Sequence, residues 1–285
     1  MAETTAERPA VSGDDLQKLV ALLKNVDTVE SWSGSGTDRA LELDSLQAQL
    51  RQVFFFETPD LALDKAGVVV RARRSQKKGD DTVVKLRPVV PSELPKELRR
   101  SPDFGVEVDV SPKGFVCSGS LKGVPTGGDV RKTALSGKQI RKLFTKEQRA
   151  LFEAHAPEGV KLDDLSILGP LLVMKLKHSP EGLDRRLVTE LWLYPDGSRI
   201  LELSTKCEPG EAFQVAAETR AFLASKGVDL GSEQQTKTRS ALEFFSKQLA
   251  NGGAVDKRPA KKKRADASQR EASPKAASTT AESRP

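Results

Sequence analysis

The sequence predicts an α+β protein in which antiparallel strands, interrupted by helices, can close into a barrel. Three observations lead to this fold class. Several short apolar segments carry charged residues two positions apart, which is the side-chain period of a β-strand. An Asp-Gly turn joins two of these segments, as is typical of an antiparallel hairpin. Between and after the strand segments, apolar residues recur at helical spacing.

The N-terminal part is expected to hold one helix before the strands begin. Residues 1–11 are polar and are expected to be disordered. Ser12 fits the start of a capping box for a helix over 15–25, whose apolar residues follow the helical period. The Ser- and Gly-rich segment 31–38 indicates a loop, and residues 39–49 allow a short helix that runs into the next strand.

Strands are predicted to dominate from residue 51 onward, with helices between and after two strand groups. The first strand group covers residues 52–58, 67–74, 81–88 and 105–110. The second group covers residues 170–178, 185–195 and 198–206. Helices are expected over 136–157 with Ser136 at the cap, over 210–227 after Pro209, and over 232–250. Residues 251–285 are rich in Ala, Lys, Ser and Pro and are expected to form a disordered basic tail.

Four of the predicted strands present two like charges on one face. The pairs are Arg71 and Arg73, Lys85 and Arg87, Glu107 and Asp109, and Lys175 and Lys177. Like charges side by side repel, so sorting them by strand is unfavourable unless a ligand of opposite sign is present. The pattern therefore favours a site for a highly charged anion and its metal. An ordinary solvated sheet face is the alternative.

The net charge and the cysteine content limit the other classes of function. The tail from Asp256 contains nine Lys or Arg and four Asp or Glu, so it carries five of the six net positive charges of the chain. The folded part is thus nearly neutral, which favours a local anion site over a broad nucleic-acid surface. No apolar run is long enough for a membrane helix, and no secretory signal is visible. With only Cys117 and Cys207, a cytoplasmic protein with reduced thiols is expected.

The segment 54–74, FFFETPDLALDKAGVVVRARR, carries a more specific resemblance. Its Phe-rich strand, the Glu-Thr-Pro-Asp-Leu turn, the Ala-Gly pair and the Arg-x-Arg strand are similar to the CYTH family. This family comprises the triphosphate tunnel metalloenzymes, which include class IV adenylyl cyclases and thiamine triphosphatases. The matching charges continue in order to Glu202, so the resemblance spans residues 50–230.

This resemblance implies an eight-stranded antiparallel tunnel with helices outside, within a domain expected over 12–250. The implied phosphate-binding residues are Arg71, Arg73, Lys85, Arg87, Lys175, Lys177 and Arg186. The implied metal ligands are Glu107, Asp109, Glu190 and Glu202, with Glu30 as a further candidate. Mg²⁺ or Mn²⁺ is the implied cofactor, because carboxylates are hard oxygen ligands for these ions.

The first strand departs from the family pattern. Members begin with a strand that bears Glu-x-Glu-x-Lys, but here the corresponding segment 28–34 keeps only Glu30. Glu42 and Asp44 have the right spacing but precede the next strand, where a turn is expected. The loss leaves both metal binding and tunnel closure open.

Three functions remain open at this stage. The first is divalent-metal-dependent hydrolysis of a triphosphate such as tripolyphosphate or ATP. The second is cyclisation of ATP to cyclic AMP and pyrophosphate, since both reactions need the same phosphate clamp. The third is binding of ATP or polyphosphate without turnover. The basic tail is a candidate for binding nucleic acid or polyphosphate, with a solvated tail as the alternative. No residue pattern reveals the catalytic group or the oligomeric state.

Overall fold

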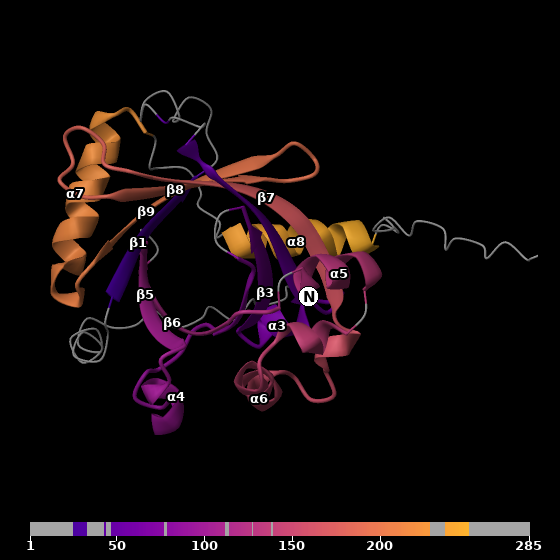
Figure 1. The fold of residues 1–285 in the computed structure, drawn as a ribbon. Coiled ribbons are helices and arrows are strands. Elements are labelled where there is room, and N and C mark those ends of the chain that lie inside the picture. Colours follow the sequence, from indigo (N-terminus) through magenta and orange to yellow (C-terminus); the bar gives the residue numbers. More distant parts are fainter. Residues whose placement is uncertain are drawn as a thin grey trace, which may run out of the picture. The chain divides into compact units, whose positions relative to one another are not determined.

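The computed structural model describes residues 25–32, 43, 47–76, 79–111, 114–126, 128–137, 139–228 and 237–250, with the backbone alone for 25–32. Nine strands of this part form a closed barrel in the order β1-β5-β6-β4-β3-β2-β7-β8-β9 (Figure 1). The strands are β1 Asn25–Trp32, β2 Gln49–Glu57, β3 Val68–Ser75, β4 Asp81–Leu86, β5 Phe104–Ser111, β6 Gly114–Gly123, β7 Ser166–His178, β8 Leu187–Leu193 and β9 Arg199–Cys207. The predicted α+β tunnel architecture is confirmed.

Eight of these strands, from β5 through β6, β4, β3, β2, β7 and β8 to β9, pair antiparallel throughout. The antiparallel arrangement was predicted, but β6 was not among the strands predicted from the sequence. β1 closes the ring because it pairs antiparallel with β9 and parallel with β5. The sequence placed Asn25 at the end of a helix and Trp32 in a loop, but both belong to β1. The rest of the predicted N-terminal helix, and Glu42 and Asp44, lie outside the described residues.

Four described helices, α3 to α6, lie in connections between strands, whereas α7 and α8 follow β9. The helices are α3 Ala62–Lys65, α4 Lys96–Arg100, α5 Asp129–Ser136, α6 Lys146–His155, α7 Ala212–Ser225 and α8 Lys237–Ala250. Short 3₁₀ turns are η2 Ile140–Leu143, η3 Leu162–Asp164 and η4 Pro209–Glu211. None of the described helices has the length and apolar character needed to span a membrane.

The single helix predicted over 136–157 is wrong at its start. Ser136 ends α5, and α6 begins ten residues later after Thr145. A reciprocal capping box fixes this start: the Gln148 backbone N–H donates to Thr145 Oγ1, and the Thr145 backbone N–H donates to Gln148 Oε1. The Gln148 side chain also donates to the carbonyl groups of Thr82 and Leu121, which ties α6 to β4 and β6.

Alternation along the strands gives the barrel two different faces. On one face, Phe54 and Phe56 of β2 and Ala72 of β3 are buried in a core that also contains residues of α5 and α6. α7 lies beside β1 and buries Val215 and Leu223 in two further clusters on the same side (Figure 1). The other face carries the charged pairs of β3, β4, β5 and β7 and is described below.

The connection between β2 and β3 is held by a buried carboxylate. The Glu57 side chain accepts hydrogen bonds from the backbone N–H groups of Leu63 and Asp64, at 2.9 Å each. Burial raises the pKa of Glu57, although these hydrogen bonds act in the opposite direction. Gly67 follows with a φ of 74°, and a Cβ atom there would lie 2.6 Å from the Arg87 carbonyl oxygen. This glycine therefore lets the start of β3 lie directly against the end of β4, where Arg87 projects.

Candidate anion-binding site

The register of the barrel places the predicted charges on one face. Residues directly opposite each other in neighbouring strands point to the same side of a sheet. Arg71 lies opposite Val83, and Lys85 follows two residues later on the same face. Lys175 lies opposite Glu190 in the same way. We call this side of the barrel the charged face; it is the side away from α5, α6 and α7.

The β3 and β4 part of this face holds a group that we call the cationic cluster: Arg71, Arg73, Lys85 and Arg87. Three of these cations form ion pairs with two carboxylates. Arg73 Nε donates to Asp81 Oδ1 at 2.8 Å, whereas Lys85 and Arg87 share Asp109 at 3.7 and 2.8 Å. Burial lowers the pKa of Lys85, with Asp109 acting against this shift.

Arg71 differs from its three neighbours. No carboxylate of the described residues lies within ion-pair distance of its guanidinium, and its buried Nε has no hydrogen-bond partner there. Burial, followed by the nearby charge of Arg73, lowers the pKa of Arg71 to about 10. A buried cation without a partner is costly unless an anion neutralises it. Arg71 thus marks the place on the charged face where an added anion would be stabilised most.

On β2, β7, β8, β9 and α8 lies a second group, the balanced cluster: Arg51, Lys175, Glu190, Glu202 and Lys237. Lys175 Nζ lies 2.7 Å from Glu190 Oε1, and Lys237 Nζ lies 2.8 Å from Glu190 Oε2. Lys237 also donates to Glu202, and Arg51 lies 3.8 Å from Glu190. Burial alone would raise the pKa of Glu190, but Lys237 and Lys175 bring it well below its ordinary value. Burial opposes the charge of Lys237, and the two glutamates nevertheless raise its pKa.

Some predicted residues lie away from these clusters. Lys177 is an exposed residue of β7, and Arg186 is exposed just before β8. Glu107 is only half-buried and forms a 3.5 Å ion pair with Lys206. Glu30 lies opposite Leu203, whereas Ser31 lies opposite Glu202. In the backbone register it is therefore Ser31, and not Glu30, that is paired with the predicted ligand Glu202.

The described carboxylates do not fit a resident divalent ion. Among the residues that the structure describes, no group of three or more His, Cys, Asp and Glu side chains could hold a metal. Each of the predicted ligands Glu107, Asp109, Glu190 and Glu202 has a Lys or Arg within ion-pair distance. Mg²⁺ and Mn²⁺ need several oxygen ligands, and here those oxygens already accept from cations. The expected Mg²⁺ or Mn²⁺ has no matching donor set in this arrangement.

Sequence reasoning missed three charged residues of the site. Asp81 stands four residues before Lys85, so the same two-residue period could have placed it on the charged face. Arg51 precedes the Phe-rich strand and becomes part of the face only through its pairing with β7. Lys237 belongs to a correctly predicted helix, but its glutamate partners are 35 and 47 residues away in sequence.

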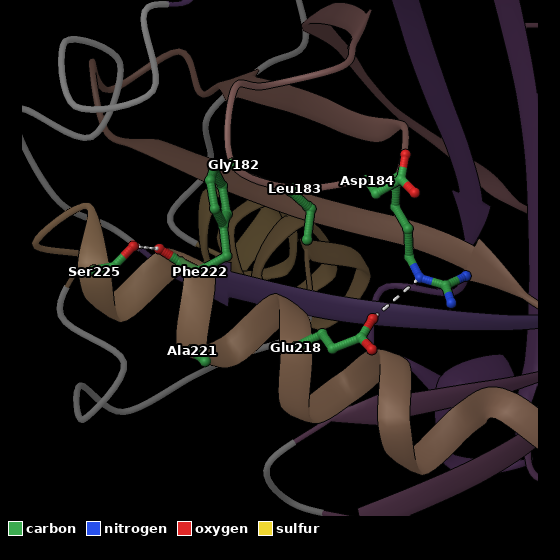
Figure 2. Close-up of a pocket in the computed structure, with 8 residues that line it drawn as sticks. Gly182, Leu183, Asp184, Glu218, Ala221, Phe222 and Ser225 are labelled. Carbon is green, nitrogen blue, oxygen red and sulfur yellow. Dashed lines mark hydrogen bonds and ion pairs between the residues drawn. The ribbon is translucent and has the colours of Figure 1, made fainter.

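A surface hollow of about 570 Å³ lies elsewhere, between the β7–β8 connection and α7 (Figure 2). Leu183, Ala221 and Phe222 supply much of its apolar lining. Its arginine, Arg185, lies 3.4 Å from both Glu211 and Glu218 and so is neutralised. None of the predicted phosphate-binding residues lines this hollow, which separates it from the charged face.

Comparison with known proteins finds similarity in structure only. No family model and no curated protein sequence matches the chain. A candidate adenylate cyclase from Bacillus halodurans superposes with a TM-score of 0.51 at 13% identity, covering 76% of this chain and 98% of the other. A candidate adenylyl cyclase from Hippeastrum, described as having a dominant triphosphatase activity, gives a TM-score of 0.56 at 13% identity over 77% and 95% of the two chains. The chain therefore has the CYTH, or triphosphate tunnel, fold.

Proposed function

We propose that this protein binds a small molecule containing a triphosphate group on the charged face of its barrel. The observation that carries the proposal is Arg71, next to Arg73 and Lys85: its Nε is buried without a hydrogen-bond partner, and no carboxylate of the described residues lies within ion-pair distance of its guanidinium. A triphosphate carries about four negative charges and would offset the repulsion among these cations. ATP and tripolyphosphate are the candidate ligands.

The side-chain chemistry of the cationic cluster supports phosphate as the anion. Arg offers two parallel N–H donors that match the oxygens of a phosphate, and Lys adds a compact charge. Arg71 and Arg73 lie two residues apart on β3, and Lys85 projects from the neighbouring strand. Adjacent cations of this kind would contact successive phosphates of an extended chain. Lys175 would contribute only after partial release from Glu190, because it already forms a 2.7 Å ion pair.

Hydrolysis of the triphosphate is the activity that we favour. The triphosphatase activity described for the structural neighbour from Hippeastrum supports this choice. In this reaction a water oxygen bonds to the terminal phosphorus and the bridging P–O bond breaks. The bridging oxygen departs with the remaining diphosphate, as pyrophosphate or ADP, while the terminal group becomes orthophosphate and a proton of the water passes to solvent. Arg71, Arg73 and Lys85 would hold the phosphates and stabilise the negative charge on the departing oxygen. A divalent ion would enter as part of the substrate complex with Mg²⁺ or Mn²⁺.

Two other functions each have an observation in their favour. The adenylate cyclase description of both structural neighbours favours attack of the ribose 3′-hydroxyl on the α-phosphorus of ATP, with release of pyrophosphate. Binding without turnover is favoured by the ion pairs of the predicted metal ligands. Each of the four whose side chains the structure describes already pairs with a Lys or Arg. The three functions share the same bound triphosphate and differ in the product formed.

One assay distinguishes the three functions. Purified full-length protein is incubated with tripolyphosphate or ATP and with Mg²⁺ or Mn²⁺, and phosphate, pyrophosphate and cyclic AMP are measured. Orthophosphate is the expected product. Cyclic AMP with pyrophosphate would indicate the cyclase. Measurable triphosphate binding without any product would contradict both enzyme functions.

The binding site itself is tested by a double variant. Arg73→Ala with Lys85→Ala should abolish binding of tripolyphosphate in calorimetry, because both cations belong to the cationic cluster. Arg185→Ala is the matched control, since this arginine lies by the surface hollow and pairs with Glu211 and Glu218. Undiminished binding by the double variant would show that the charged face is not the site.

A further inference from the structure

Lys237 occupies an unusual position for a lysine. It belongs to α8, and its ammonium lies on the charged face between the carboxylates of Glu190 and Glu202. The Nζ atom also lies 5.1 Å from the centre of the Trp192 ring. Two carboxylates and an aromatic face thus surround one ammonium group, which is a favourable environment for a desolvated cation.

The packing of α8 fixes this ammonium in place. Ala241, Leu242 and Phe245 of α8 are buried against Trp192 and Tyr194 in one apolar cluster. The Tyr194 hydroxyl donates to the Lys237 carbonyl at 3.2 Å. Further along the helix, the Ser246 hydroxyl donates to the Pro59 carbonyl at 3.0 Å. The position of Lys237 is therefore set by a docked helix and not by a freely moving side chain.

Glu190 and Glu202 are the described acidic pair that would otherwise suit a divalent ion. They lie directly opposite each other on β8 and β9, so both carboxylates reach the same space. The two oxygens of Glu190 are already engaged, Oε1 by Lys175 and Oε2 by Lys237, and Glu202 accepts from Lys237 as well. A divalent ion there would have to replace the ammonium, because both cations need the same carboxylate oxygens.

We propose that Lys237 is the resident cation of the Glu190–Glu202 pair and that it excludes Mg²⁺ and Mn²⁺ from these carboxylates while α8 is docked. The proposal concerns the free protein and a metal ion alone, so it holds or fails independently of triphosphate binding.

The test measures Mn²⁺ binding to the full-length protein by electron paramagnetic resonance, without phosphate. Wild-type protein should bind no more Mn²⁺ than Glu202→Gln. Lys237→Met should bind Mn²⁺ at least about tenfold more tightly than wild type, because each carboxylate it releases becomes a metal ligand. Mn²⁺ should also raise the melting temperature of this variant and leave that of wild type unchanged.

Two controls keep the experiment decisive. Lys206→Met removes another lysine that pairs with a glutamate, Glu107, on the charged face and should not gain Mn²⁺ affinity. If Lys237→Met does not fold, the comparison of wild type with Glu202→Gln still shows whether these carboxylates bind Mn²⁺ in the wild-type protein. A wild-type Mn²⁺ site that Glu202→Gln removes would overturn the proposal, as would a folded Lys237→Met protein without gained affinity.

Discussion

The balanced cluster and the cationic cluster lie on the same face of one barrel but use their charges differently. In the balanced cluster, Arg51, Lys175 and Lys237 all contact Glu190, and Lys237 also contacts Glu202. In the cationic cluster, Asp81 and Asp109 are shared among three cations, and Arg71 has no carboxylate of the described residues within ion-pair distance. The difference indicates that the first group stabilises the fold and the second group is available to an anion.

The physical reason is the cost of burying charge. A buried ion pair contributes little net stability, but removal of one partner leaves the other charge buried and uncompensated. Substitutions in the balanced cluster should therefore lower the free energy of unfolding. Substitution of a cation that already lacks a partner should instead leave stability unchanged or raise it, and should lower affinity for an anion.

The largest effect is expected for Glu190→Ala. This change removes the carboxylate shared by Lys175 and Lys237 and should lower the free energy of unfolding by about 3–5 kcal/mol. Urea denaturation measures it. Glu107→Ala is the matched control: its ion pair with Lys206 is partly solvated, so the loss should stay below about 1 kcal/mol. Equal losses for the two variants would remove the distinction between the clusters.

Arg71→Gln should act on binding and not on stability. Loss of a charge-assisted contact to phosphate should weaken tripolyphosphate binding by about 1.5–3 kcal/mol, or roughly 10- to 100-fold in calorimetry. The free energy of unfolding should remain equal or rise, since the buried Nε of Arg71 has no hydrogen-bond partner and its guanidinium has no carboxylate partner among the described residues. Arg185→Gln should change neither quantity in the same experiments. A destabilised Arg71→Gln protein with unchanged affinity would assign Arg71 to the fold.

The balanced cluster should also make the stability of the protein depend on pH. The pKa of Glu190 in the folded protein lies well below its ordinary value of 4.5, despite burial, because of Lys237 and Lys175. Its contribution to stability is therefore complete above about pH 4.5 and is lost as the pH falls through the lowered pKa. The wild-type free energy of unfolding should fall in this acid range more steeply than that of Glu190→Gln, by at most about 1.4 kcal/mol per pH unit. Urea denaturation between pH 3 and 7 checks the difference, and parallel curves would contradict it.

The strand pattern of the sequence predicted most of the charged face. A two-residue period in β3, β4, β5 and β7 was enough to sort charged from apolar side chains, because it depends only on local backbone geometry. The helix starts were less predictable. The start of α6 did carry a local signal, the Thr145-x-x-Gln148 capping box, which the predicted helix over 136–157 overlooked. Only the contacts of Gln148 with β4 and β6 are tertiary and leave no local signal.

The ion pairs could not be predicted for the same reason. Glu190 and Glu202 read as metal ligands by their position on neighbouring strands, and only the docking of α8 brings Lys237 between them. Glu30 read as a remnant of a metal-binding strand, and only the register of β1 with β9 puts it opposite Leu203. Residue types identified a charged site, whereas pairing across the barrel decides which charges are free for a ligand.

The smallest effect is expected for Lys177→Ala. Lys177 shares the two-residue period of Lys175 but is exposed, and exposed charges contribute about 0.2–1 kcal/mol. Tripolyphosphate binding should therefore weaken by about twofold to fivefold at low salt. The effect should disappear near 1 M salt, where the screening length is about 3 Å. The Arg71→Gln effect should persist there, because burial protects that contact from screening. A loss for Lys177→Ala as large as that for Arg71→Gln would move the main phosphate contact to the exposed end of β7.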